Sequence, residues 1–173
     1  MSSDHAPFIL TLKLDDESFR YFTALRDEHF PTERNYLSAH ITLFHKLPGD
    51  EGAHICEVLA DISAEQPPLS LHFPGVQSLG GGVAIQVESR ALLRVRQRLA
   101  TAFADWLSPQ DQQRFRPHIT VQNKVRKETA AALHTQLSTM WQPFDGVGEG
   151  LILWRYRGGP WERIDEFLFL SIV

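Results

Sequence analysis

The sequence predicts an α+β protein made of two similar lobes. Its 173 residues suit one domain or two intimately joined lobes, and a chain with 43% hydrophobic and 22% charged residues can bury its own core. Strand-like and helix-like segments alternate along the chain. One tetrapeptide occurs twice, as His40–Leu43 and His118–Val121, about half the chain apart. We therefore expect residues 1–173 to form one bilobal domain in which each lobe contributes one copy to a shared cleft.

The first half of the chain starts with a strand and a helix. Residues 8–14 alternate and are rich in β-formers, which predicts a strand. Acidic residues at 15–17 favour a helix start, and Pro31 ends this helix after about Phe30. The elements predicted next are a strand at 39–47 closed by Pro48-Gly49, a helix from 50 to about 64 that stops before Pro67-Pro68, and a strand at 69–73.

The second half contains the longest predicted helix. Apolar residues recur at helical spacing between Ser89 and Leu107, namely Leu92, Val95, Leu99 and Phe103. Glycines at 80–82 separate the strand at 69–73 from one at 83–88. The remaining predicted elements are a strand at 118–122, a helix at 127–141, and strands at roughly 148–156 and 164–173 with a Gly-Gly-Pro turn at 158–160.

Bulk features narrow the class of protein. Cys56 is the single cysteine, so an intrachain disulfide is impossible. The first residues have no basic patch followed by an apolar run, and no stretch approaches the roughly 18 apolar residues that span a membrane. We therefore expect a soluble, cytoplasmic protein without a membrane partner, and a monomer.

Charge is unevenly distributed along the chain. The net charge is −4, yet the segment from Arg90 to Lys127 holds nine basic residues and only two acidic ones. This segregation favours an anionic ligand near that segment, with a solvated helix face as the alternative for the arginines between 90 and 98. An acidic protein is unsuited to wrapping long duplex nucleic acid, so a small nucleotide or an RNA terminus fits better.

The repeated tetrapeptide places polar side chains on one face of each predicted strand. Side chains alternate along a strand, so the histidine and threonine of each copy point one way and the two apolar residues the other. A histidine on a strand is more often a surface or structural residue, and a single copy would mean little. Two copies with similar surroundings indicate a functional pair.

The two motifs resemble those of the 2H phosphoesterase superfamily, which contains 2′,5′ RNA ligases and cyclic phosphodiesterases. The segment from Phe115 to Val121 is similar to that family's second signature, aromatic-x-Pro-His-x-Thr-apolar, and the segment from Ala39 to Phe44 is similar to its first. The likeness covers essentially the whole chain. It implies two pseudo-symmetric lobes of antiparallel sheet, with outer helices and a central active-site groove.

The chemistry of the motif residues matches that resemblance. Cleaving a phosphodiester requires a base for the attacking oxygen and an acid for the leaving oxygen, and histidine, with a pKa near 6.5, can serve as either. We predict that His40 and His118 are catalytic and that the hydroxyls of Thr42 and Thr120 bind the phosphate oxygens. The sequence leaves open which histidine is the acid.

Four further residues are candidate substrate contacts. Family members often carry an arginine five residues after the second histidine; this chain has Asn123 there, and the adjacent Lys124 would face away on a regular strand. His45 would also face away from His40 if its strand stays regular. Arg155 and Tyr156 lie at the end of a late strand, where a solvated strand end is the alternative. Trp154 and Trp161 can stack on a base, with core packing as their alternative.

The predicted activity is that of a metal-independent phosphodiesterase acting on a small nucleotide or RNA end with a 2′,3′-cyclic or 2′,5′-linked phosphate. The sequence contains no H-E-x-x-H, paired-cysteine or Asp-rich metal motif and no Walker or G-x-G-x-x-G element, so we expect no metal and no cofactor. Two alternatives remain: an RNA 2′,5′ end-joining enzyme, and a non-catalytic nucleotide-binding module.

Overall fold

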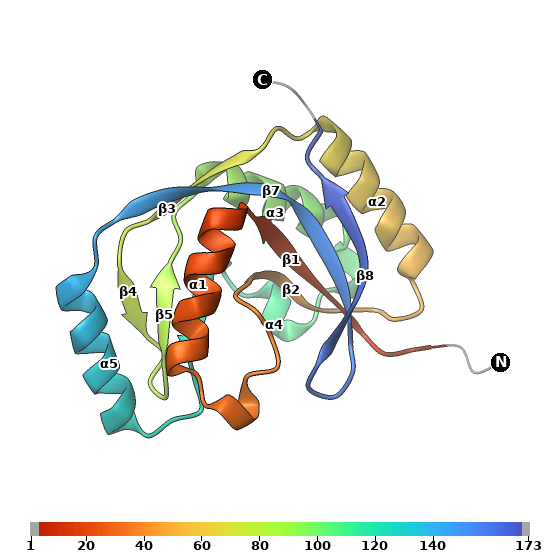
Figure 1. Cartoon of the computed structure of the whole chain (residues 1–173). Helices are drawn as coiled ribbons and strands as arrows, with labels where there is room; N and C mark the ends of the chain where they lie inside the picture. Colours follow the sequence, from red (N-terminus) through yellow and green to blue (C-terminus); the bar gives the residue numbers. More distant parts are fainter. Residues whose placement is uncertain (1–3, 171–173) are drawn as a thin grey trace.

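The computed structural model describes residues 4–170, and its larger sheet is antiparallel and five-stranded (Figure 1). Four strands pair in the order β2–β1–β7–β3, and β8 pairs with β7 as well. The long strand β7 joins this sheet together, because its first residues, 144–148, pair with β3 and its later residues pair with both β1 and β8. The strands are β1 (Phe8–Leu14), β2 (Ile41–Leu47), β3 (Leu69–Phe73), β7 (Phe144–Tyr156) and β8 (Trp161–Leu168).

A second antiparallel sheet has three strands in the order β4–β5–β6. Its strands are β4 (Val76–Ser78), β5 (Val83–Gln86) and β6 (His118–Gln122). A single β-bridge between His72 and Glu88 connects β3 to the segment that follows β5, so the two sheets meet through the backbone at this point. The strands β2 and β6, which carry the two copies of the repeated motif, contact each other across the junction between the sheets.

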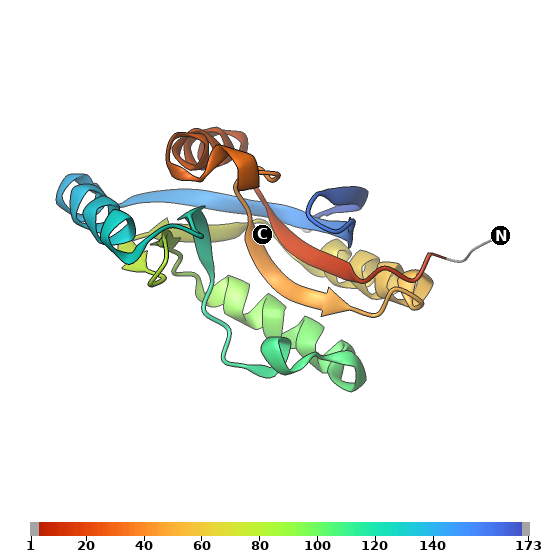
Figure 2. The same ribbon diagram turned by 90° about the horizontal axis from the view of Figure 1, so that it is seen from below.

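Helices cover the outside of the strands. Figure 2 shows α1 on one side of the strands and α3 on the opposite side. The apolar positions of α3 behave as their spacing predicts, since Leu92, Val95 and Leu99 are buried. The helices are α1 (Asp16–His29), α2 (Gly52–Glu65), α3 (Arg90–Ala102), α4 (Pro109–Gln112) and α5 (Lys127–Met140), with short 3-10 turns at Thr32–Arg34 and Ala104–Trp106.

Each motif strand is the last element of a similar local unit, in which a strand is followed by a helix and then by the motif strand, which pairs antiparallel with the first strand. In the first copy β1 is followed by α1 and then by β2, which pairs with β1. In the second copy β5 is followed by α3, by the short helix α4 and then by β6, which pairs with β5. Both helices start with a side-chain cap: Asp15 accepts from the backbone N–H of Ser18, and Ser89 accepts from that of Leu92.

The predicted α+β class with two antiparallel sheets and outer helices is confirmed, and one hydrophobic cluster includes buried residues of both sheets, such as Leu10, Ile41, Ile85 and Ile119. Short elements escaped prediction: β4 has three residues and α4 four, too few to show a periodic pattern. The strand β7 starts at Phe144 rather than at 148, and the predicted last strand extends to 171–173, which lie outside the described residues.

Candidate active site

The side chains of His40, Thr42, His118 and Thr120 line one cleft of about 460 Å³. All four are half-buried, while their apolar neighbours at 41, 43, 119 and 121 are buried. This alternation is what the strand pattern predicts. The cleft lies where β2 of the larger sheet approaches β6 of the smaller one, so each sheet contributes one histidine and one threonine to it.

The two histidines are held by the same local hydrogen bond. Nδ1 of His40 lies 2.8 Å from the carbonyl oxygen of Ser38, and Nδ1 of His118 lies 2.8 Å from the carbonyl oxygen of Arg116. A carbonyl only accepts, so each Nδ1 carries a proton and donates it. These hydrogen bonds fix the tautomer and the orientation of both rings. In each ring, Nε2 is the nitrogen that remains available for proton transfer.

A β-bulge follows the threonine in both motif strands. Opposite β1, the register moves from Thr11–Thr42 to Leu10–Phe44, which makes Leu43 the extra residue. Opposite β5, it moves from Ala84–Thr120 to Val83–Gln122, which makes Val121 the extra residue. Bulges re-aim the residues that follow them and are frequent beside active sites. The two copies are therefore similar in backbone conformation as well as in sequence.

Two buried arginines bind backbone carbonyls at these bulges. Arg26 of α1 is 3% exposed and donates from Nη1 to the carbonyl of Thr120 at 3.1 Å. Arg96 of α3 is 7% exposed and donates from Nε to the carbonyl of Leu43 at 2.7 Å. Each helix thus holds the motif strand of the other copy. Burial lowers the pKa of Arg26 to about 10, which leaves its guanidinium charged at neutral pH.

The cleft is basic. Three arginines line it together with one acidic residue, Asp111; the arginines are Arg96, Arg114 and Arg116. Arg114 and Arg116 are exposed and lie four and two residues before His118. The sequence indicated these two arginines only as members of the basic segment from 90 to 127, and it did not predict that they belong to the site. Of the arginines on α3, Arg94 and Arg98 are exposed, as the solvated-face alternative expects, but Arg96 is buried.

The surroundings of His40 favour its neutral form. Burial against the protein, together with the positive charge of Arg26 and the proximity of His118 and His45, lowers the pKa of His40 from 6.5 to about 4. The hydrogen bond to the Ser38 carbonyl opposes this change without cancelling it. The ring of Trp161 contacts His40 with a centroid distance of 4.8 Å and contributes to this partly desolvated environment.

A third histidine lies in the same cleft. The bulge at Leu43 breaks the regular alternation that would have turned His45 away, and His45 lines the cleft beside His40. Its Nδ1 lies 3.0 Å from Oδ1 of Asp111. Burial opposes ionisation of Asp111, but hydrogen bonds from the side chain and backbone of His45 and from the backbone of Lys46 outweigh it and lower the pKa of that carboxyl group. Asp111 is therefore ionised, and its carboxylate binds His45.

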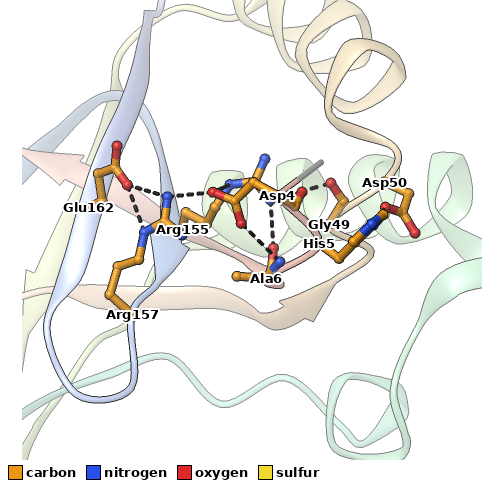
Figure 3. Close-up of polar contacts among 8 residues, drawn as sticks. All are labelled: Asp4, His5, Ala6, Gly49, Asp50, Arg155, Arg157 and Glu162. Atoms are coloured by element: carbon orange, nitrogen blue, oxygen red, sulfur yellow. Dashed lines mark hydrogen bonds and ion pairs between the residues drawn. The ribbon is translucent and has the colours of Figure 1, made fainter. Parts of the chain in front are cut away.

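The other three candidate contacts lie elsewhere. Lys124 is exposed and adopts a φ of 63°. It does not belong to the residues that line the described cleft. Arg155 donates to the backbone carbonyls of Asp4, Ala6 and Gly49 and thereby fastens the N-terminal segment to β7 (Figure 3). Tyr156 is exposed at the end of β7, also outside the described cleft.

Metal-binding clusters and membrane-spanning helices are both missing from the described part of the chain. Between residues 4 and 170, no group of three or more histidine, cysteine, aspartate or glutamate side chains is arranged to hold a metal ion. Over the same residues, no helix has both the length and the apolar character that crossing a membrane demands.

Comparison with known proteins agrees with this architecture. The sequence model of the 2'-5' RNA ligase superfamily matches residues 14–160, so the chain belongs to that superfamily. No curated protein matches the sequence. Among solved structures, TT0787 of Thermus thermophilus superposes with a TM-score of 0.68 at 15% identity, over 95% of this chain and 98% of that one. LigT of E. coli complexed with 3'-AMP gives 0.66 at 14% identity, over 97% and 100%. At such identities, these structures show a shared fold.

Proposed function

We propose that this protein is a metal-independent phosphodiesterase acting on a small nucleotide or an RNA end with a 2′,3′-cyclic or 2′,5′-linked phosphate. Membership of the superfamily supports phosphoesterase or ligase-type activity. The observation that carries the narrower proposal is the pair of His-x-Thr side chains lining one basic cleft, each histidine with Nδ1 bonded to a backbone carbonyl. The LigT structures with 3'-AMP, NADP+ and ATP fit a nucleotide ligand.

In the proposed reaction a phosphate lies between His40 and His118. One histidine takes a proton from the attacking water through Nε2, the water oxygen bonds to phosphorus, and the bond from phosphorus to the leaving ribose oxygen breaks. The other histidine gives its proton to that oxygen. The hydroxyls of Thr42 and Thr120 donate hydrogen bonds to the non-bridging oxygens, and the cleft arginines offset the negative charge.

End joining is the second candidate, because the superfamily takes its name from 2'-5' RNA ligases. The same residues would then act on a ribose hydroxyl in place of water: one histidine takes its proton, its oxygen bonds to the phosphorus of a cyclic phosphate, and the ribose oxygen that leaves receives the proton of the other histidine. A binding module without catalysis is less well supported, since ligand binding alone does not require an acid and a base held in matching tautomers.

One screen separates these functions. The purified protein is incubated in EDTA with 2′,3′-cyclic, 2′,5′-linked and 3′,5′-linked substrates, and with RNA fragments that carry a cyclic phosphate and a free hydroxyl end. Turnover of the first two classes that survives chelation supports the proposal. Joined fragments would establish the ligase. Activity that chelation removes and a divalent ion restores contradicts a metal-independent mechanism.

A further inference from the structure

A second pocket adjoins the cleft at His40. It has a volume of about 410 Å³ and shares two lining residues with the cleft, His40 and Trp161. A ligand whose phosphate contacts His40 in the cleft therefore lies directly beside this pocket. The start of α1, the loop that precedes β2, and the strands β1, β7 and β8 form its walls.

Aromatic side chains from three separate segments line this pocket. Phe19 comes from α1, Tyr36 from the loop before β2, and Trp154 and Trp161 from the β7–β8 hairpin. Phe19 is 39% exposed and Tyr36 is 61% exposed, so both present ring surface that the core does not use. Trp161 lies between His40 and Trp154, with ring-centroid distances of 4.8 Å and 6.1 Å. The ring of Trp161 is tilted by 57° to that of His40 and by 58° to that of Trp154, so these rings do not stack on one another. Aromatic ring surfaces that line a pocket bind flat ring systems.

The β7–β8 hairpin is shaped to bring Trp161 to this position. Gly158 has a φ of 83°, which a residue with a side chain rarely adopts, and this allows the tight turn at 158–160. A side-chain carbon placed on Gly159 would lie 3.6 Å from the ring of Tyr36, so the turn packs directly against that tyrosine. Trp154 is fixed in turn, because its Nε1 donates to the hydroxyl of Thr11 at 2.9 Å.

The charges of the pocket differ from those of the cleft. Its cations are Lys13 and Arg163, and both pair with Glu166. Asp16 adds a carboxylate and Ser38 a hydroxyl to the lining. The cleft, by contrast, holds three arginines against one aspartate. A neutral aromatic pocket beside a cationic cleft matches a ligand with an uncharged flat ring at one end and a phosphate at the other.

We propose that this aromatic pocket binds the nucleobase of the substrate, stacked on Tyr36 and the indole of Trp161, while the phosphate lies in the cleft. The inference rests on the proposed function and adds that the substrate is a nucleoside phosphate with its base on the His40 side. Asp16 and Ser38 supply an acceptor and a hydroxyl for polar groups at the edge of the base. Specificity for a base then depends on residues outside the repeated motifs.

The test compares substrates with and without a base. Adenosine 2′,3′-cyclic phosphate and methyl riboside 2′,3′-cyclic phosphate present the same reacting group, and kcat and KM are measured for wild-type protein, Tyr36→Ala and Tyr36→Phe. Tyr21→Ala is the matched control, since it removes another exposed tyrosine from outside both pockets. Loss of one stacking surface should raise the KM for the adenosine compound about 5- to 100-fold in Tyr36→Ala, with kcat nearly unchanged.

In the same variant, the KM for the baseless compound should stay within about twofold, and Tyr36→Phe should restore most of the loss because it retains the ring. An unchanged KM for the adenosine compound in Tyr36→Ala, or an equal rise for both compounds, overturns the inference. If wild-type protein turns over neither compound, the proposed function fails separately. The pocket is then tested by calorimetric titration with adenosine 3′-phosphate and with inorganic phosphate, where only the first should weaken in Tyr36→Ala.

Discussion

The two motif histidines share one hydrogen-bonding pattern but differ in their surroundings. Each donates from Nδ1 to the carbonyl oxygen two residues earlier in the chain. His40 is further enclosed by Trp161 and lies near the charge of Arg26. These features disfavour its imidazolium form, so in the proposed reaction His40 would start in the form that accepts a proton.

Replacing either histidine tests its proposed role. We expect His40→Ala and His118→Ala each to reduce kcat about 10²–10⁴-fold, because each removes one proton-transfer group. Thr42→Ala and Thr120→Ala should cost less, since each removes one hydrogen-bond donor. His54→Ala, at an exposed position of α2, is the control. Circular dichroism checks that all variants fold, and a histidine variant that keeps wild-type turnover has no catalytic role.

The low pKa of His40 predicts a titration that NMR can follow. Its ring signal, assigned by comparison with His40→Gln, should stay at the neutral position from pH 8 to about pH 5.5 and move only near pH 4. An unfolded chain takes up this proton near pH 6.5. Between these values the unfolded state binds more protons at this site, so His40 makes the folded state less stable as the pH falls from about 6.5 to 4.

His40→Gln should therefore lose less stability than wild-type protein over that interval. Urea denaturation at several pH values measures the difference. A His40 signal that titrates near pH 6.5 in the free protein would contradict the neutral assignment, whatever the activity of the variant.

At the scale of elements, the sequence revealed the motif strands but not their bulges. The burial pattern of the two motif tetrapeptides could be predicted because alternation is a local property of the chain, but it stops at the residue after each motif, where two buried residues follow one another. A bulge adds one residue to a strand without altering the kinds of residue found there, and its position depends on how that strand pairs with its partner. The position of His45 was for this reason not predictable, although the residue itself was noted. The role of Arg96 escaped prediction because only the folded chain brings α3 to β2.

The arginines that bind the bulge carbonyls are expected to support both stability and the site. Arg96→Met removes the donors to the carbonyls of Leu43 and Asp111 and leaves buried acceptors without partners. We expect unfolding free energy to fall by on the order of 1–3 kcal/mol. Arg94→Met, at an exposed position of the same helix, should change it by less than about 0.5 kcal/mol. Chemical denaturation measures both, and equal effects would contradict a bracing role.

At the scale of the whole molecule, two repeats contribute to one site because each helix binds the other repeat's strand. Arg26 of α1 reaches β6, and Arg96 of α3 reaches β2. The basic segment from 90 to 127 contains the second motif, and three of its nine basic residues, Arg96, Arg114 and Arg116, line the cleft. The pocket residues, by contrast, are dispersed from Thr11 to Arg163 and carry no shared sequence signature.

This arrangement predicts that the chain unfolds as one cooperative unit, in keeping with the proposed single domain. The hydrophobic cluster contains residues of both sheets, and the two arginines connect each helix to the opposite repeat. Neither sheet can lose its partner without exposing apolar surface and leaving buried carbonyls without donors, so partial unfolding is disfavoured. Tryptophan fluorescence and far-UV circular dichroism should report the same urea midpoint, and the calorimetric and van't Hoff enthalpies should agree. Two separated transitions would instead mean that the two sheets fold independently and that the cleft between them is free to open.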